Sequence, residues 1–235
     1  MSAFVSVALG IGATQTASAQ DILSSLYSSR PIAMWHGVYV GGNAGYGWGK
    51  VNTDATGVVT TPSTSYTMNG FVGGAQMGGN YQTGNFVLGF EIDFQGSAQK
   101  SSSPATVGGV AATDTNKLPW FSTARLRVGV AADAMLIYAT AGAAYGEHKR
   151  KIQYVASGNV GFDTTVTRLG WAAGGGIEGL LTKNWSWRAE YLHLHWGTYN
   201  QDFIISVGGV PIGTMTMNTK VSDNIARFSL NYFLR

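Results

Sequence analysis

The sequence predicts an all-β protein, an eight-stranded antiparallel up-and-down transmembrane β-barrel. First, segments in which apolar and polar residues alternate recur eight times, and their polar faces carry charges of both signs. This alternation is typical of strands with lipid on one face and a polar lumen on the other. Second, charged residues make up only 11% of the chain, against about 25% in average proteins. Third, short and long connections alternate between the segments, as in outer-membrane barrels.

Composition narrows the classes of function. The chain has 33 glycines, 12% aromatic residues and a mean hydropathy of +0.04. No apolar run approaches the roughly 18 residues of a transmembrane helix. The net charge of +3 is small and dispersed, which argues against a nucleic-acid partner. Cysteine is absent, so disulfide frameworks and thiol chemistry are excluded.

The N-terminal residues predict export. We interpret residues 1–19 as a signal peptide, because residues 4–13 are apolar and Ala17-Ser18-Ala19 forms a cleavage site. The usual basic region is missing, and a buried N-terminal strand is the alternative. Residues 20–34 are polar and unpatterned, and we expect a short periplasmic N-terminal tether. The outer-membrane barrel is expected to occupy residues 35–235.

The first four expected strands each place apolar residues outward and polar residues inward. They cover residues 35–50, 66–82, 85–95 and 118–131. The third shows the pattern most clearly, with Phe90 and Ile92 on one face and Glu91 and Asp93 on the other. In a barrel that spans a membrane, the apolar face contacts lipid and the acids point into the lumen.

The last four expected strands continue the pattern. They cover residues 135–146, 167–181, 185–196 and a final segment that ends at Arg235. The segment 135–146 is so rich in Ala and Gly that its facing is ambiguous, and we assign Ile137, Ala139 and Tyr145 to the outside. An even number of strands lets the first and last strands pair, which removes both edges of the sheet.

The connections are expected to be of two kinds. Short turns are predicted at residues 83–85, 132–134 and 182–184, where Gly, Asn and Asp supply backbone freedom. Long polar loops are predicted at about residues 51–65, 96–117, 147–166 and 197–220. From these lengths alone, the turns are expected in the periplasm and the loops outside the cell.

The inward faces collect four acids and four bases. These residues are Glu91, Asp93, Glu178 and Glu190, and Arg125, Arg127, Arg188 and Arg227. We interpret them as a structural charge network that plugs the lumen, because side chains fill the interior of an eight-stranded barrel. The alternative is a proton or ion path along the same charges.

Two weaker motifs bear on cofactor binding. His193 and His195 share a strand face, and with His148 they have the chemistry to bind a metal or haem. We favour an amphipathic rim beside Tyr191 and Trp196, because no third ligand is fixed by spacing. The glycines at 174, 176 and 179 match a dinucleotide fingerprint by letter only, since no helix is expected after them. No cofactor and no metal are therefore predicted.

Aromatic residues and one basic run point to the membrane surface. Many aromatics lie near strand ends on the apolar face, which predicts girdles at the lipid–water interfaces. They are Trp35, Tyr46, Trp48, Tyr81, Trp120, Tyr145, Trp185, Trp187, Tyr191 and Tyr232. The run Lys149-Arg150-Lys151 has the charge to attract anionic lipopolysaccharide, although we favour a solvated loop.

Several motifs also resemble a known family. They are WHGVYVGGNAGYGWG at 35–49, FVLGFEIDFQGS at 86–97, LPWFSTARLRVGVA at 118–131, YATAGAAYG at 138–146, the segment 170–197, and FSLNYFLR at 228–235. Together they resemble the small outer-membrane β-barrel proteins of alphaproteobacteria, the outer-membrane immunogenic or porin-family proteins. The resemblance implies an OmpA-like eight-stranded barrel without established catalytic residues. Where the family ends on Phe in the phase of Tyr232, this chain has Leu234 followed by Arg235.

These observations predict a non-enzymatic surface protein of the bacterial outer membrane. The barrel would contribute to envelope structure, and the loops would recognise partners at the cell surface. Expected partners are outer-membrane lipid, lipopolysaccharide and the barrel assembly machinery; the sequence predicts no oligomeric state. The alternative is a narrow porin that passes small solutes or ions. A barrel enzyme would need a nucleophile and a base together at the rim, and the spacing provides no such set.

Overall fold

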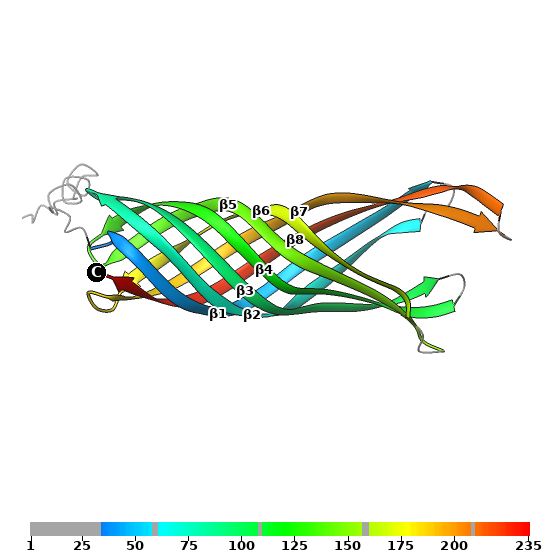
Figure 1. The fold of residues 1–235 in the computed structure, drawn as a ribbon, viewed down its shortest axis with the longest axis horizontal. Helices are drawn as coiled ribbons and strands as arrows, with labels where there is room; N and C mark the ends of the chain where they lie inside the picture. Colours follow the sequence, from blue (N-terminus) through cyan, green and yellow to red (C-terminus); the bar gives the residue numbers. More distant parts are fainter. Residues whose placement is uncertain (1–33, 58–60, 108–109, 157–159, 208–209) are drawn as a thin grey trace, which may run out of the picture.

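The computed structural model describes residues 34–57, 61–107, 110–156, 160–207 and 210–235, and they form one closed barrel (Figure 1). The expected signal peptide and all but the last residue of the expected tether lie outside the described residues. The strands are β1 (Gly37–Gly57), β2 (Thr61–Thr83), β3 (Phe86–Val107), β4 (Val110–Ala132), β5 (Met135–Tyr154), β6 (Val160–Leu180), β7 (Trp185–Val207) and β8 (Val210–Leu234).

Every strand pairs antiparallel with its neighbours in the sequence, and β1 pairs with β8 to close the sheet. The all-β class, the count of eight and the up-and-down order are thereby confirmed. The three short turns also lie where they were predicted. Gly84 and Asp133 take positive φ values of 59° and 48° in the first two of them. Both β1 and β8 have their terminal ends beside these turns, at what we call the turn end (Figure 1).

The facing of the strands is the reverse of that in a soluble protein, and it confirms the predicted alternation. Large apolar side chains point outward and are exposed, with Phe71 at 75% and Leu169 at 73%. Charged side chains such as Glu178 and Arg188 point inward and are completely buried. Among the described residues, no helix is long and apolar enough to cross a membrane.

The four long loops were predicted wrongly, because most of their residues extend the strands. β1 continues to Gly57 where the prediction ended at residue 50, and β4 begins at Val110 where it began at 118. The alternating pattern is informative only where the two faces of a strand meet different surroundings. In the sequence of these extensions polar residues often stand at consecutive positions, so the alternation fades although the backbone pairing continues.

The extensions form two separate sheets. Pairing between β2 and β3 stops at Asn69 and Lys100, and pairing between β6 and β7 stops at Trp171 and His195. The other pairs continue to the hairpin tips. We call the extended parts of β3, β4, β5 and β6 wing A, and those of β7, β8, β1 and β2 wing B. Figure 1 shows the two wings diverging at the end opposite the turns, the wing end.

Two rings of outward-facing aromatic residues bound the apolar band of the barrel. At the turn end they include Tyr81, Phe86, Trp185, Trp187 and Tyr232; at the wing end they include Tyr46, Trp48, Phe94, Trp120, Tyr145, Trp171 and Tyr191. Trp35 was wrongly assigned to the girdle. Its ring is completely buried at the turn end of the lumen and contacts Phe233 edge to face, with 6.2 Å between the ring centres. It precedes the first strand, so strand alternation did not apply to it.

Candidate functional site in the barrel lumen

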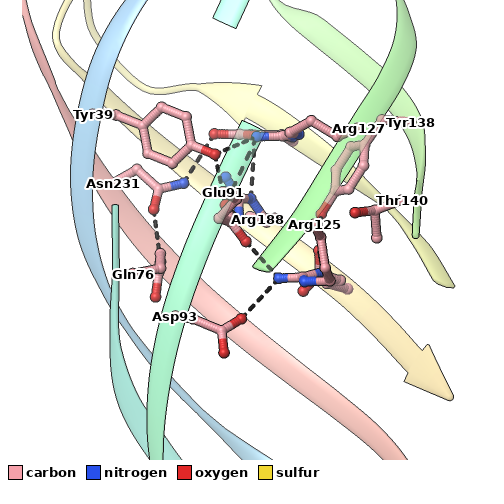
Figure 2. Close-up of polar contacts among 12 residues, drawn as sticks. Tyr39, Gln76, Glu91, Asp93, Arg125, Arg127, Tyr138, Thr140, Arg188 and Asn231 are labelled. Atoms are coloured by element: carbon pink, nitrogen blue, oxygen red, sulfur yellow. Dashed lines mark hydrogen bonds and ion pairs between the residues drawn. The ribbon is translucent and has the colours of Figure 1, made fainter. Parts of the chain in front are cut away.

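The structure brings all eight predicted lumen charges together in the middle of the barrel. Glu91 and Asp93 come from β3, Arg125 and Arg127 from β4, Glu178 from β6, Arg188 and Glu190 from β7, and Arg227 from β8. Each lies in the inward phase of its strand, and each is at most 5% exposed. Figure 2 shows side chains from opposite walls of the barrel converging.

Glu91 is the centre of this network. Its Oε1 lies 2.6 Å from Nη2 of Arg125 and 3.5 Å from Nη2 of Arg227. Its Oε2 pairs with Nη1 of Arg188 and accepts a 2.6 Å hydrogen bond from the Tyr39 hydroxyl. With Arg127 at 4.0 Å from Oε2, one carboxylate thus contacts four guanidinium groups from three strands, which offsets the cost of burying its charge.

The other charges divide into a group on each side of Glu91. Toward the wing end, Arg125 and Arg227 both lie 2.9 Å from Oδ2 of Asp93. The same arginines contact Glu190 at 3.2 and 2.5 Å. Toward the turn end, Arg127 and Arg188 contact Oε2 of Glu178 at 2.7 and 3.2 Å. Each acid therefore meets at least two bases.

Uncharged polar side chains extend the network, and the predicted set of eight charges did not include them. The hydroxyls of Tyr138 and Ser186 donate to Glu190 and Glu178 at 2.7 and 2.6 Å. Asn231 donates to Glu178 at 2.9 Å and accepts from Gln76 at 2.7 Å. The inward phase of their strands was the available signal. Tyr138 was not predicted to join the network, because most of its side chain is an apolar ring. The centre of that ring lies 4.0 Å from the Arg127 guanidinium carbon.

Apolar layers lie above and below the charges. On the wing side the layer is formed by Val51, Met68, Val72, Leu118, Phe121, Ala144, Ala172, Leu192, Leu194, Trp196, Val221 and Ile225. On the turn side it is formed by Trp35, Tyr39, Val87, Ala131, Leu136, Tyr138 and Phe233. Along β7, Arg188 and Glu190 are followed inward by Leu192 and Leu194. The inward faces are therefore not polar throughout, because apolar layers interrupt them on both sides of the central charges.

The histidines do not form a common site. His193 and His195 face outward and pack beside Trp171, with ring centres 5.6 and 5.5 Å apart. His148 faces inward against Trp196, at 5.0 Å. Trp196 is buried inside the barrel, so its expected place on an outer rim with the histidines was wrong; residues of opposite phase face opposite sides of a strand. The part of the chain that the structure describes holds no cluster of three or more potential metal ligands.

The glycines of the dinucleotide-like motif lie within β6, and a strand follows them where a nucleotide site would need a helix. A Cβ atom on Gly174 would come within 2.0 Å of the Tyr191 carbonyl oxygen on β7. The glycine therefore permits close approach of the two strands, as expected.

The basic run separates according to strand phase. Lys149 and Lys151 point outward, whereas Arg150 points inward and lies 2.7 Å from Asp114 of β4. His148 lies beyond the wing-end aromatic ring, outside the membrane-spanning part. Burial, and then the nearby Arg168 charge, lower the pKa of its imidazole to about 4.

Comparisons with known proteins agree with this architecture. Residues 4–222 match the family model of the outer membrane protein β-barrel domain. The chain is 33% identical to the 31 kDa outer-membrane immunogenic protein of Brucella melitensis, over 92% of this chain and 93% of the relative. It is 32% identical to the 22 kDa outer membrane protein of Rhizobium leguminosarum, over 74% and 70%. The crystal structure of the outer membrane protease OmpT from Escherichia coli shares the fold alone (TM-score 0.52, 8% identity, 84% and 97% covered).

Proposed function

Because this chain belongs to the outer-membrane β-barrel family and lies in the bacterial outer membrane, we propose that it is a non-enzymatic surface protein whose lumen is plugged by its own charges. The barrel contributes to the structure of the envelope. The wings provide the surface for recognition outside the cell.

The main support for a plugged lumen is the charge network that lies between two apolar layers. The network contains four acids and four arginines, and every one of these side chains is buried. An ion that entered would lose its hydration in the apolar layers and would then meet carboxylates already bound by arginines. In an eight-stranded barrel the side chains leave no space for a wide aqueous path around them.

Surface recognition by the wings is supported by their length and chemistry. The paired strands continue well past the aromatic ring, for example to Val207 and Val210 in wing B. The Brucella relative is described as an outer-membrane immunogenic protein, which is a property of that protein. We place the wings outside the cell and the short turns in the periplasm, as loop lengths in outer-membrane barrels favour.

Three partners follow from this placement. The apolar band and its aromatic rings fit outer-membrane lipid, and the outward lysines beyond the wing-end ring fit lipopolysaccharide. Insertion of such a barrel calls for the barrel assembly machinery. Its last strand presents Tyr232 and Leu234 to the outside.

Conductance across a planar bilayer tests the plug. We expect the folded wild-type protein to show no steady conductance. The matched variants Arg125→Ala, inside the network, and Arg150→Ala, in wing A, separate the lumen from the rest of the molecule. Leakage from Arg125→Ala alone supports the plug. Clear single-channel steps from the wild type would contradict it and favour the narrow porin.

A further inference from the structure

Three lysines lie in one line across neighbouring strands of wing A. The backbone register places Lys100 of β3 opposite Lys117 of β4, and Lys117 opposite Lys149 of β5. Directly paired strands lie about 4.8 Å apart, so the three side chains start close together. We call Lys100, Lys117 and Lys149 the lysine row.

The lysine row faces away from the lumen. All three residues are exposed, and their neighbours in the chain, Gln99, Leu118 and His148, point inward. The strand phase therefore points the three lysine side chains away from the inward side of wing A. They lie on the outer wall of the molecule, on the face that continues the lipid-facing surface of the barrel.

The row has fewer counter-charges than positive charges. Like charges directly opposite each other on paired strands are destabilising. Among the described residues, the row makes a single ion pair, 3.0 Å between Lys149 and Glu147, and none with Lys100 or Lys117. The row carries three positive charges against this one acid, so an anion that bridges the strands would relieve the repulsion.

The residues around the lysine row indicate which kind of anion fits it. On the barrel side lies the aromatic ring, where Phe94 stacks on Trp120 at 5.7 Å and Trp120 contacts Tyr145 at 5.8 Å. At about 2.5 Å of height per residue in a tilted strand, Lys149 stands about 10 Å beyond Tyr145. Long lysine side chains can reach back toward the interface from that height.

Hydroxyl groups lie on the far side of the row. Ser102 and Thr115 are opposite each other in the next outward position, and their side-chain oxygens are 3.3 Å apart. Lys151 is paired with Thr115 at the same level. The site thus offers ammonium and hydroxyl donors above a ring of aromatics, which suits an acidic headgroup attached to acyl chains.

We propose that the lysine row binds the phosphorylated headgroup of lipopolysaccharide, with the acyl chains lying against Phe94, Trp120 and Tyr145. This inference rests on the proposed placement of the wings outside the cell, and it names the partner of their base. In the part of wing B that the structure describes, no equivalent row occurs. There Lys50 is opposite Thr67 and Ser222, and Lys220 is opposite Asn52 and Thr198.

Binding of lipid A to the full chain, folded in neutral detergent, tests the proposal. The row variant is Lys100→Gln, Lys117→Gln and Lys149→Gln together. The control variant removes the same charge elsewhere, as Lys50→Gln, Lys183→Gln and Lys220→Gln together. Native mass spectrometry measures bound lipid A, and the gel shift between boiled and unboiled samples checks that each variant is folded.

We expect the row variant to bind bisphosphorylated lipid A at least tenfold more weakly than the wild type, and the control variant within about threefold. Wild-type binding should fall at least tenfold for dephosphorylated lipid A. Millimolar inorganic phosphate should not compete, because it lacks acyl chains. If the row variant does not fold, Lys117→Gln alone should still weaken binding several-fold.

Equal binding by wild type and row variant would overturn the proposal, as would equal binding of dephosphorylated lipid A. Competition by inorganic phosphate would instead identify a site for free phosphate and would also overturn it. Conductance by the wild type would refute the plugged lumen but would leave these binding results unchanged. Failure of one proposal is therefore distinguishable from failure of the other.

Discussion

The same eight strands build the barrel and the wings, but charged and apolar residues are distributed over their two faces differently in the two regions. Between the aromatic rings, the outer face is apolar and charges are buried and paired inside, as with Arg125 and Glu91. In wing A the charges lie on both faces, and the inward pair of Arg150 and Asp114 keeps 27% and 12% of its side-chain area exposed. The difference shows that the surroundings of a strand, lipid or water, decide which residues each face carries.

Breaking one ion pair in each region should give the largest contrast. Arg125→Ala leaves Glu91, Asp93 and Glu190 with fewer partners in a buried site, and we expect a loss of about 3–5 kcal/mol in the free energy of unfolding. Arg150→Ala in wing A should lose only about 0.2–1 kcal/mol, because that pair is partly solvated. Urea unfolding in lipid vesicles measures both. Equal losses would remove the distinction between the two regions.

An arginine on the outer face should also separate the regions. Phe90→Arg places a charge on the lipid face of the barrel and should cost about 2–4 kcal/mol, reducing the yield of folded protein in vesicles. Ser102→Arg places the same charge on the outer face of wing A, where water is present, and should fold like the wild type. Similar folding yields for the two variants would contradict the lipid-facing assignment.

The stability of wing A should depend on pH through His148. This effect should be smaller than that of Phe90→Arg. The pKa of His148 is about 4 in the folded protein, against 6.5 ordinarily, so the unfolded chain binds more protons between these values. Stability is full above pH 6.5 and falls as the pH drops toward 4, by about 1–2 kcal/mol at pH 5. Protease resistance of wing A against pH measures this loss. His148→Gln should flatten the profile, and an unchanged slope would show that other groups cause it.

Single cysteines should reveal the two ends without altering stability. This chain has no cysteine of its own, so Ser102→Cys and Lys183→Cys each introduce one label site. An impermeant maleimide applied to intact cells should label position 102 in wing A and should spare position 183 in a short turn. The reverse labelling would invert the proposed orientation.

The sequence predicted most reliably the strand segments whose two faces meet unlike surroundings. Glu91 and Asp93 alternate with Phe90 and Ile92, so both the strand and the inward place of the acids could be predicted. The apolar layers could not, since Leu192 and Leu194 point inward and alternate with outward histidines, the reverse of the pattern around Glu190. Their place depends on height within the barrel, which sequence spacing does not give.

The lysine row illustrates a second limit. The three charges at residues 149–151 are consecutive in the sequence, yet Arg150 points to the opposite side of the strand from the two lysines. The true neighbours of Lys149 lie 32 and 49 positions earlier in the chain, at Lys117 and Lys100. Only the pairing register brings them together, and register depends on long-range contacts.

The central charges also govern how the two ends of the sheet can join. Arg227 of β8 lies 2.9 Å from Asp93 of β3, across the lumen and 134 positions away in the chain. A slip of one residue where β8 meets β1 would turn Arg227 toward lipid and Phe228 inward. The network thus penalises closure in the wrong register. A barrel whose β8 is shifted by one residue against β1 would expose an arginine to lipid and leave Asp93 without that partner.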